Sequence, residues 1–288
     1  MKVTPTPQNN VQLALDIRRG QWLLSDAEAL LPVALDFLAH VPPRLEALDF
    51  EPMAHMETGT AVALESAQPQ KKKCVATIPV FGTLTKYNTC GTIGTTTIAA
   101  ELLRIAADER VAGIVLDIDS GGGSSNAIPV MIDAIHKVQE SGKPIVVHGD
   151  LCASAAYWIA SQCDAIFADN PLSYFGSIGV MTQLIDPSNL KSGERVISVY
   201  AKESSDKNLS YRKALEGDFE LIQSEMSPVV QQFHAAVKAG RSRLQADIAG
   251  VLSGAMFRAE RAKEIGMIDN LLTLDQTVEN VFTRAEYR

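Results

Sequence analysis

Two loops rich in small residues, each at the end of a predicted strand, carry the residues best placed for chemistry. The first is the run Gly121-Gly122-Gly123, which follows a strand ending at Ile118. Glycines let the backbone adopt positive φ and approach a ligand closely, and a helix start beside them favours negative charge. That combination suits an oxyanion hole, where backbone donors meet a developing alkoxide. The alternative is a tight strand-to-helix turn without chemistry.

The second loop places a serine, Ser154, between Ala153 and Ala155 at the start of a predicted helix. A hydroxyl there lies at a helix N-terminus, and the amide of Ala155 offers a second oxyanion donor. The small neighbours leave room for a substrate carbonyl. The alternative is that Ser154 is an ordinary helix N-cap.

A serine nucleophile needs a base within hydrogen-bond reach. The chain has five histidines, and none stands in a recognisable context with a paired acid; His148 is predicted to be a strand-end residue. Lysine is the alternative, because a Ser–Lys dyad works where burial lowers the pKa of the lysine. Lys202 and Lys207 follow a predicted strand at 195–200, and by default each would be a solvated loop residue.

Composition limits what these loops can serve. The 288 residues are 46% hydrophobic with a net charge of −8, which predicts a soluble α/β protein and argues against a nucleic-acid-binding surface. The four cysteines lack Cys-x-x-Cys spacing, so neither a zinc site nor a disulfide framework is predicted, and no cofactor is expected. Cys152, close to Ser154, is predicted to be packed rather than catalytic.

The N-terminus lacks the pattern of a signal peptide. No apolar run approaches the roughly 20 residues of a membrane span. We therefore expect a cytoplasmic protein without a membrane anchor.

The elements that position the two loops alternate between strand and helix from Cys74 onward. Strands are predicted at 75–80, 111–118, 144–148, 165–168 and 195–200, and helices at 97–107, 127–141, 155–162 and within 211–243. Repeated units of this kind favour an α/β fold with a largely parallel sheet covered by helices. Residues 1–70 are predicted to be a mostly helical N-terminal extension that ends in a linker, and residues 71–288 the main domain.

Four sequence blocks, in order, resemble the signal peptide peptidase A type of serine peptidases, including their phage capsid-maturation relatives, within the Clp-protease/crotonase superfamily. The resemblance covers roughly residues 74–275. The blocks are Asp119-Ser120-Gly121-Gly122-Gly123, Ala153 to Ala160, Gly176-Ser177-Ile178-Gly179-Val180, and Ala259 to Asp269. The resemblance implies a fold of repeated β-β-α units.

The resemblance also implies residue roles. Ser154 would be the nucleophile, the amides of Gly122 and Ala155 the oxyanion donors, and Gly121 and Gly123 the residues that shape the turn. The segment Gly176, Ser177, Ile178 and Gly179 would hold an extended substrate through its backbone.

The lysine block departs from the family pattern. An ungapped match places Ser205 at the lysine position, and a shift of two residues places Lys207 there. We favour Lys207 as the base, with Lys202 as the alternative. Gly121 also replaces the usual proline of the glycine turn, and Ala156 replaces a glycine after the serine.

The resemblance implies a serine endopeptidase of the capsid-assembly type, soluble in the cytoplasm or in a phage prohead, whose substrate is a peptide or a scaffold protein. Homo-oligomers are expected, with the helical segment 211–243 as a candidate interface. Three alternatives stay open: a housekeeping peptidase, a crotonase-like acyl-CoA enzyme and an inactive structural homologue.

Overall fold

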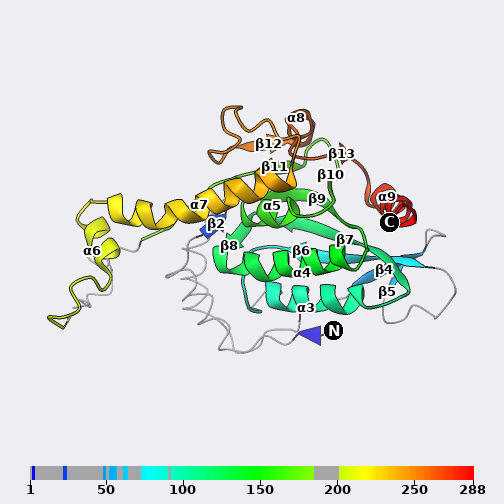
Figure 1. Ribbon diagram of the computed structural model, residues 1–288, viewed down its shortest axis with the longest axis horizontal. Helices are drawn as coiled ribbons and strands as arrows, with labels where there is room; N and C mark the ends of the chain where they lie inside the picture. Colours follow the sequence, from blue (N-terminus) through cyan, green and yellow to red (C-terminus); the bar gives the residue numbers. More distant parts are fainter. Residues whose placement is uncertain are drawn as a thin grey trace.

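A nine-stranded, largely parallel sheet forms the centre of the protein (Figure 1). The computed structural model describes residues 2–3, 22–24, 48–49, 52–56, 61–63, 73–89, 92–184 and 201–288. Neighbouring strands of the main path follow the order β12-β11-β9-β7-β6-β4-β5, and β10 and β13 branch from β9. The predicted α/β class with a largely parallel sheet is confirmed.

The four central strands are parallel and apolar. They are β6 (Cys74–Phe81), β7 (Val111–Ser120), β9 (Ile145–Ala153) and β10 (Ala165–Ala168). Continuous runs of β-branched and other apolar residues are typical of parallel strands that are covered on both faces. The predicted strands match all four, although β7 and β9 continue further, into the two loops that could carry chemistry.

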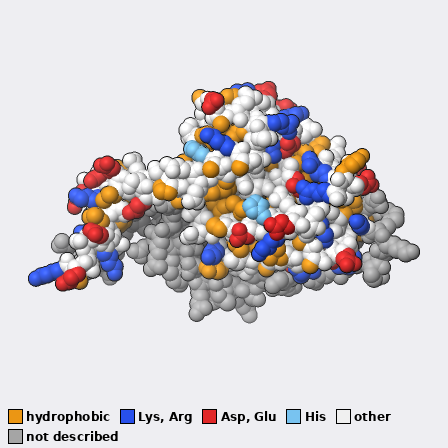
Figure 2. Space-filling model, in the orientation of Figure 1, with side chains coloured by type: hydrophobic (Ala, Val, Ile, Leu, Met, Phe, Trp, Pro, Cys, Tyr) orange, Lys and Arg blue, Asp and Glu red, His pale blue; other side chains and the backbone are white. Residues whose placement is uncertain are grey.

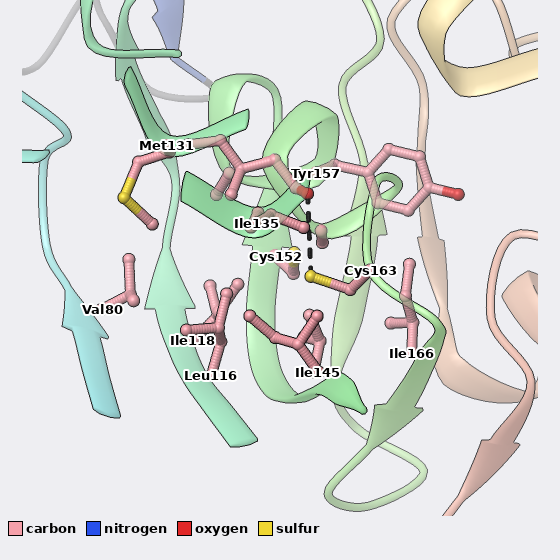
Figure 3. Packing of buried hydrophobic residues seen from close by; sticks show 14 of the residues in the cluster. Val80, Leu116, Ile118, Met131, Ile135, Ile145, Cys152, Tyr157, Cys163 and Ile166 are labelled. Carbon is pink, nitrogen blue, oxygen red and sulfur yellow. Dashed lines mark hydrogen bonds between the residues drawn. The ribbon is translucent and has the colours of Figure 1, made fainter. Parts of the chain in front are cut away.

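Helices cover both faces of this sheet. On one face lie α3 (Thr95–Ala106), α4 (Ile128–Glu140) and the short α5 (Ala155–Ala160). Figure 3 shows the core beneath them, where Met131 and Ile135 of α4 meet Leu116 and Ile118 of β7. The opposite face packs on α9 (Leu274–Glu286) through a second apolar cluster.

Strands of the N-terminal region correct part of the sequence prediction. β4 (Met53–Met56) pairs with β6 and β5 (Ala61–Ala63) pairs with β4, so the stretch predicted to be a linker contributes two strands at one side of the sheet, with β5 at its edge. The short strands β1 (Lys2–Val3) and β3 (Leu48–Asp49) pair with each other.

Residues 22–24 are a further correction, because they form strand β2 (Trp22–Leu24) where short helices were predicted. β2 pairs with β8 (Gly122–Ser124), a strand made of the glycine turn itself. The strand predicted at 195–200 lies outside the described residues.

The chain after β10 adds an edge and an arm. β11 (Tyr174–Gly176), β12 (Met256–Arg258) and α8 (Ala259–Glu264) extend one side of the sheet, and β13 (Asn270–Leu271) pairs with β10. The arm consists of α6 (Leu209–Leu215) and the long α7 (Glu220–Gly240), and Figure 1 shows it projecting from the body.

The C-terminal half of α7 anchors the arm to α5. Trp158 of α5 stacks on Phe233 of α7 with ring centroids 4.6 Å apart. A Cβ on Gly240 would lie 1.9 Å from the carbonyl oxygen of Ser161, so only glycine permits this close approach. Along the same helix, the first half is largely exposed.

Candidate active site

Ser154 joins the end of β9 to the first residue of α5 in a strained conformation. Its backbone has φ 55° and ψ −120°, outside the regions that residues with a side chain normally adopt. The turn is held by a hydrogen bond from its N–H to the Gly176 carbonyl (2.8 Å) and by one from the Trp158 N–H to the Ser154 carbonyl (2.9 Å). Strain of this kind costs roughly 1–3 kcal/mol and gathers at functional sites.

The Ser154 side chain does not behave as a helix N-cap. A capping hydroxyl accepts a hydrogen bond from the second or third amide of its helix, and Ser154 makes no such bond. The residue is 1% exposed, and its Oγ has no hydrogen-bond partner among the described residues. Buried hydroxyls are nearly always paired, so an unpaired one calls for an explanation such as catalysis.

The glycine turn lies beside this serine. Ser120, the last residue of β7, is in register with Cys152, two residues before Ser154 on β9. Because β7 and β9 are parallel, their carboxyl ends meet at one edge of the sheet, which brings the two predicted loops together. β8 then packs close to α5.

Hydrogen bonds inside the turn decide which glycine amide is free. Ser120 Oγ donates to the Gly82 carbonyl (2.6 Å) and accepts from the Gly122 N–H (3.1 Å). The amide of Gly122, the donor that the resemblance implied, is therefore already engaged. On the next residue, a Cβ added to Gly123 would lie 2.0 Å from the Leu84 carbonyl oxygen, so this position requires glycine.

The predicted substrate-holding segment, Gly176 to Gly179, divides between two roles. Gly176 pairs with Ala153 of β9 on one side and Met256 of β12 on the other, so no strand can add there. Gly176 (φ 137°) instead shapes the Ser154 turn.

The other three residues of this segment, Ser177, Ile178 and Gly179, follow strand β11. Ser177 (φ 55°) donates its N–H to the Ala255 carbonyl (2.9 Å), Ile178 is buried in the core, and Gly179 lies near Gly254.

The two candidate lysines lie away from Ser154. Lys202 and Lys207 are both exposed, in the turns that lead into α6. In Figure 1, α6 lies at the far end of the arm, beyond the start of α7. At 1.5 Å per residue, the start of α7 is about 20 Å from Phe233, where that helix meets α5. Within one chain, the structure does not bring Lys207 to the serine.

The sequence analysis missed a buried histidine, His148, that is paired with two carboxylates. His148 Nδ1 lies 2.9 Å from Asp117 Oδ1, and its Nε2 lies 3.2 Å from Asp169 Oδ1. Burial lowers the pKa of His148, but hydrogen bonding and charge from Asp117, together with the charge of Asp169, outweigh it and raise that pKa. Both ring nitrogens are engaged, so His148 is not free to serve Ser154. The signal was the register, since Asp117 and His148 are directly opposite on neighbouring strands.

The remaining candidates have structural explanations. Cys152 is fully buried and desolvation raises the pKa of its thiol, so it is not an activated nucleophile. Figure 3 shows Cys152 and Cys163 within the apolar core. Within the described ranges, no group of three acidic, histidine or cysteine side chains could hold a metal ion, and no helix is long and apolar enough to cross a membrane.

Comparison with known proteins identifies the family. The model of peptidase family S49 matches residues 137–288, more than half of the chain, and the matched range contains Ser154 and the whole arm. The protein belongs to peptidase family S49.

Individual relatives are more distant. The chain is 31% identical to Protease 4 of Salmonella typhi over 192 residues, covering 66% of this chain and 31% of the relative. It is 26% identical to capsid assembly protease C of Escherichia phage lambda over 208 residues, covering 69% of this chain and 46% of the relative.

The chain thus spans less than half the length of these two curated relatives. Among solved structures, a mutant of the 1510-N membrane-bound stomatin-specific protease aligns with a TM-score of 0.47 at 16% identity, covering 71% of this chain and 82% of that one.

Proposed function

We propose that this protein is a serine endopeptidase of the Clp-protease/crotonase type whose nucleophile is Ser154. The observation that carries the proposal is the conformation of Ser154: a strained, buried serine with an unpaired Oγ at a helix start beside a glycine turn. A crotonase-like acyl-CoA enzyme would need the paired amides but would have no use for such a serine. Membership of peptidase family S49 supports peptide-bond hydrolysis as the reaction.

The reaction is a two-step acyl transfer. A neutral base removes the Ser154 proton, and Oγ attacks the peptide carbonyl to give a tetrahedral oxyanion. The amine leaves with a proton, and water then hydrolyses the acyl-enzyme with the same base.

Two backbone amides stabilise the oxyanion. One is Ala155, the first residue of α5, whose N–H has no partner inside the helix. We assign the other to Gly123 in place of Gly122, because the Gly122 amide already donates to Ser120.

The base is Lys207, with Lys202 as the alternative. A lysine is neutral near pH 7 only where its surroundings lower its pKa, and both lysines are exposed in the described chain. The arm must therefore pack against a surface that buries Lys207 near Ser154. A second copy of the chain offers such a surface, which agrees with the expected homo-oligomer.

The biological role that we favour is the processing of a scaffold protein in the cytoplasm or inside a prohead. The relatives include a protein named capsid assembly protease C, and the described residues contain no membrane-spanning helix. The alternative is a soluble housekeeping peptidase, since other relatives are named Protease 4. Neither role requires a cofactor or a nucleic acid.

Three variants test the site. Ser154→Ala and Lys207→Ala should each lower the cleavage of fluorescein-labelled casein by at least roughly a thousandfold, because nucleophile and base act as one unit. Lys202→Ala is the matched control, a second exposed lysine of the same loop, and should retain activity. Wild-type rates for Ser154→Ala would overturn the nucleophile; wild-type rates for Lys207→Ala would overturn only the base.

A further inference from the structure

A strand from the N-terminal region lies along the edge of the glycine turn. β2 runs antiparallel to β8, with Trp22 opposite Ser124, Leu23 opposite Gly123 and Leu24 opposite Gly122. The two strands form a small sheet separate from the central one, and Figure 1 shows β2 beside β8 near α5.

Backbone geometry fixes which glycine faces β2. On its other side, β8 bonds to Leu84: the Leu84 N–H donates to the Gly122 carbonyl and the Ser124 N–H to the Leu84 carbonyl, both at 2.8 Å. Backbone groups of alternate residues in a strand point to opposite neighbours. The N–H and C=O of Gly123 therefore face β2, opposite Leu23.

β2 runs toward the turn that lies beside Ser154. Since the strands are antiparallel, β2 advances from Trp22 to Leu24 as β8 is followed back toward Gly122 and the turn at Ser120. That turn lies level with the end of β9, where Ser154 follows. In this pairing Leu23 lies opposite Gly123, whose amide is assigned to the oxyanion.

Adding an extended segment to a free strand edge is a common way to bind a peptide, because main-chain hydrogen bonds hold it whatever its sequence. Gly176 of β11 cannot provide such an edge, since it is paired on both sides. The edge of β8 can, and residues 22–24 of the chain occupy it.

We propose that Trp22–Leu24 is bound as a substrate strand, and that the chain cleaves itself between Leu23 and Leu24. This inference rests on the proposed peptidase function. The Leu23 carbonyl is the one opposite Gly123, so it is the carbonyl whose oxygen the Gly123 amide holds.

In the cleavage step one carbon–oxygen bond forms and one carbon–nitrogen bond breaks. Ser154 Oγ forms a bond to the Leu23 carbonyl carbon, and the Leu23–Leu24 carbon–nitrogen bond breaks. The Leu24 nitrogen leaves as an amine with the proton that came from Ser154. Water then hydrolyses the ester, which frees Ser154 and leaves a carboxylate on Leu23.

The same edge defines a substrate class for other proteins. It takes an extended segment, and the residues that occupy it in this chain are Trp-Leu-Leu, all large and apolar. A scaffold protein cleaved by this enzyme should be cut after leucine within an extended apolar segment.

Intact-mass spectrometry of the purified full chain tests self-cleavage. Wild-type protein should lose residues 1–23 and yield a species that begins at Leu24, whereas Ser154→Ala should keep its full mass. Leu23→Pro removes the N–H that faces the Gly123 carbonyl, so it should slow self-cleavage at least roughly tenfold. Leu13→Pro is the matched control, the same substitution at another leucine of residues 1–23, and should be cut at the wild-type rate.

Cleavage of labelled casein separates the two possible failures. Wild-type protein that cuts casein but keeps residues 1–23, or that is cut at another bond, would overturn the self-cleavage proposal alone. Equal self-cleavage by Leu23→Pro and Leu13→Pro would also overturn it. Wild-type protein that cuts neither casein nor itself would contradict the proposed function.

Discussion

Ser154 combines a catalytic side chain with a backbone conformation that favours glycine. At φ 55° the Cβ of any other residue is strained, yet the proposed reaction needs the hydroxyl. The hydrogen bonds to Gly176 and Trp158 hold the turn in place against this strain. The folded protein is therefore less stable with serine at this position than it would be with glycine, and such a loss of stability is common at active sites.

This strain predicts a difference between two inactive variants. Ser154→Gly relieves the positive φ, and Ser154→Ala keeps it, so the glycine variant should have a free energy of unfolding about 1 kcal/mol higher. Urea denaturation of both variants measures the difference. An alanine variant as stable as the glycine variant would show that the turn is not strained.

His148 predicts a pH dependence of stability. Its pKa in the folded protein is raised above the usual value of about 6.5. A raised folded-state pKa contributes stability that is full below the unfolded-state pKa and is lost as pH rises through the folded-state pKa. The unfolding free energy of wild-type protein should therefore exceed that of His148→Gln most below about pH 6.5, and the excess should shrink at higher pH.

Denaturation of both proteins across this pH range provides the measurement. His136→Gln, which changes an exposed histidine of α4 away from Asp117 and Asp169, is the control for the substitution itself. An excess that stays constant with pH would mean that Asp117 and Asp169 do not stabilise the charged imidazole.

At the scale of elements, the two ends of α7 differ in how much of their surface is buried against the rest of the protein. Phe233 is fully buried against Trp158, whereas Phe219, at the other end of the helix, is 50% exposed. Phe233→Ala should lower the free energy of unfolding by about 3–5 kcal/mol, and Phe219→Ala by less than about 0.5 kcal/mol. Chemical denaturation compares the two.

Since α5 begins at Ser154, loosening its contact with α7 should also slow casein cleavage by the Phe233 variant at temperatures where it stays folded. Full activity there would mean that α7 does not position the nucleophile. Equal stability of the two phenylalanine variants would contradict the anchoring role of Phe233.

The elements differ in how far the sequence could predict them. Long apolar strands and amphipathic helices, such as β7 and α4, were predicted within a few residues, because burial imposes a clear pattern. β2, β4 and β5 were missed, because strands of three or four residues hold too few alternations to show a period. Their existence depends on partners distant in sequence, such as Gly123 for Leu23.

The candidate site also contains features that the sequence could predict and features that depend on contacts between distant residues. The resemblance implied that Ser154 and the glycine turn meet, and the structure explains it, since each follows a parallel strand and such ends share an edge. The engagement of the Gly122 amide by Ser120 could not be predicted, because it depends on the rotamer of one side chain. The pairing of His148 with Asp117 required the register of β7 on β9.

At the scale of the whole molecule, the arm formed by α6 and α7 projects from the body. Leu215, Phe219 and Leu221 are large apolar residues at 42%, 50% and 39% exposure. Figure 2 shows hydrophobic side chains interspersed with charged ones along the arm. Exposed apolar residues on a projecting helix are typical of a surface that packs against another chain.

The turns that lead into the arm carry the proposed base Lys207, so one experiment can test both the oligomer and the active site. If Lys207 of one copy serves Ser154 of another, mixing Ser154→Ala with Lys207→Ala should restore activity. In a two-fold symmetric dimer with random exchange, each mixed dimer holds one complete site, so recovery should reach about a quarter of wild-type activity per chain.

Casein cleavage by the mixture gives the recovery, and size-exclusion chromatography with light scattering shows whether mixed oligomers form. The double variant carrying both substitutions, mixed with Ser154→Ala, is the control and should stay inactive because no copy supplies a nucleophile. Recovery would place the base on a neighbouring copy. Mixed oligomers without recovery would contradict delivery of Lys207 by a second copy, and the arm would then have to fold back to its own serine or leave the role to Lys202.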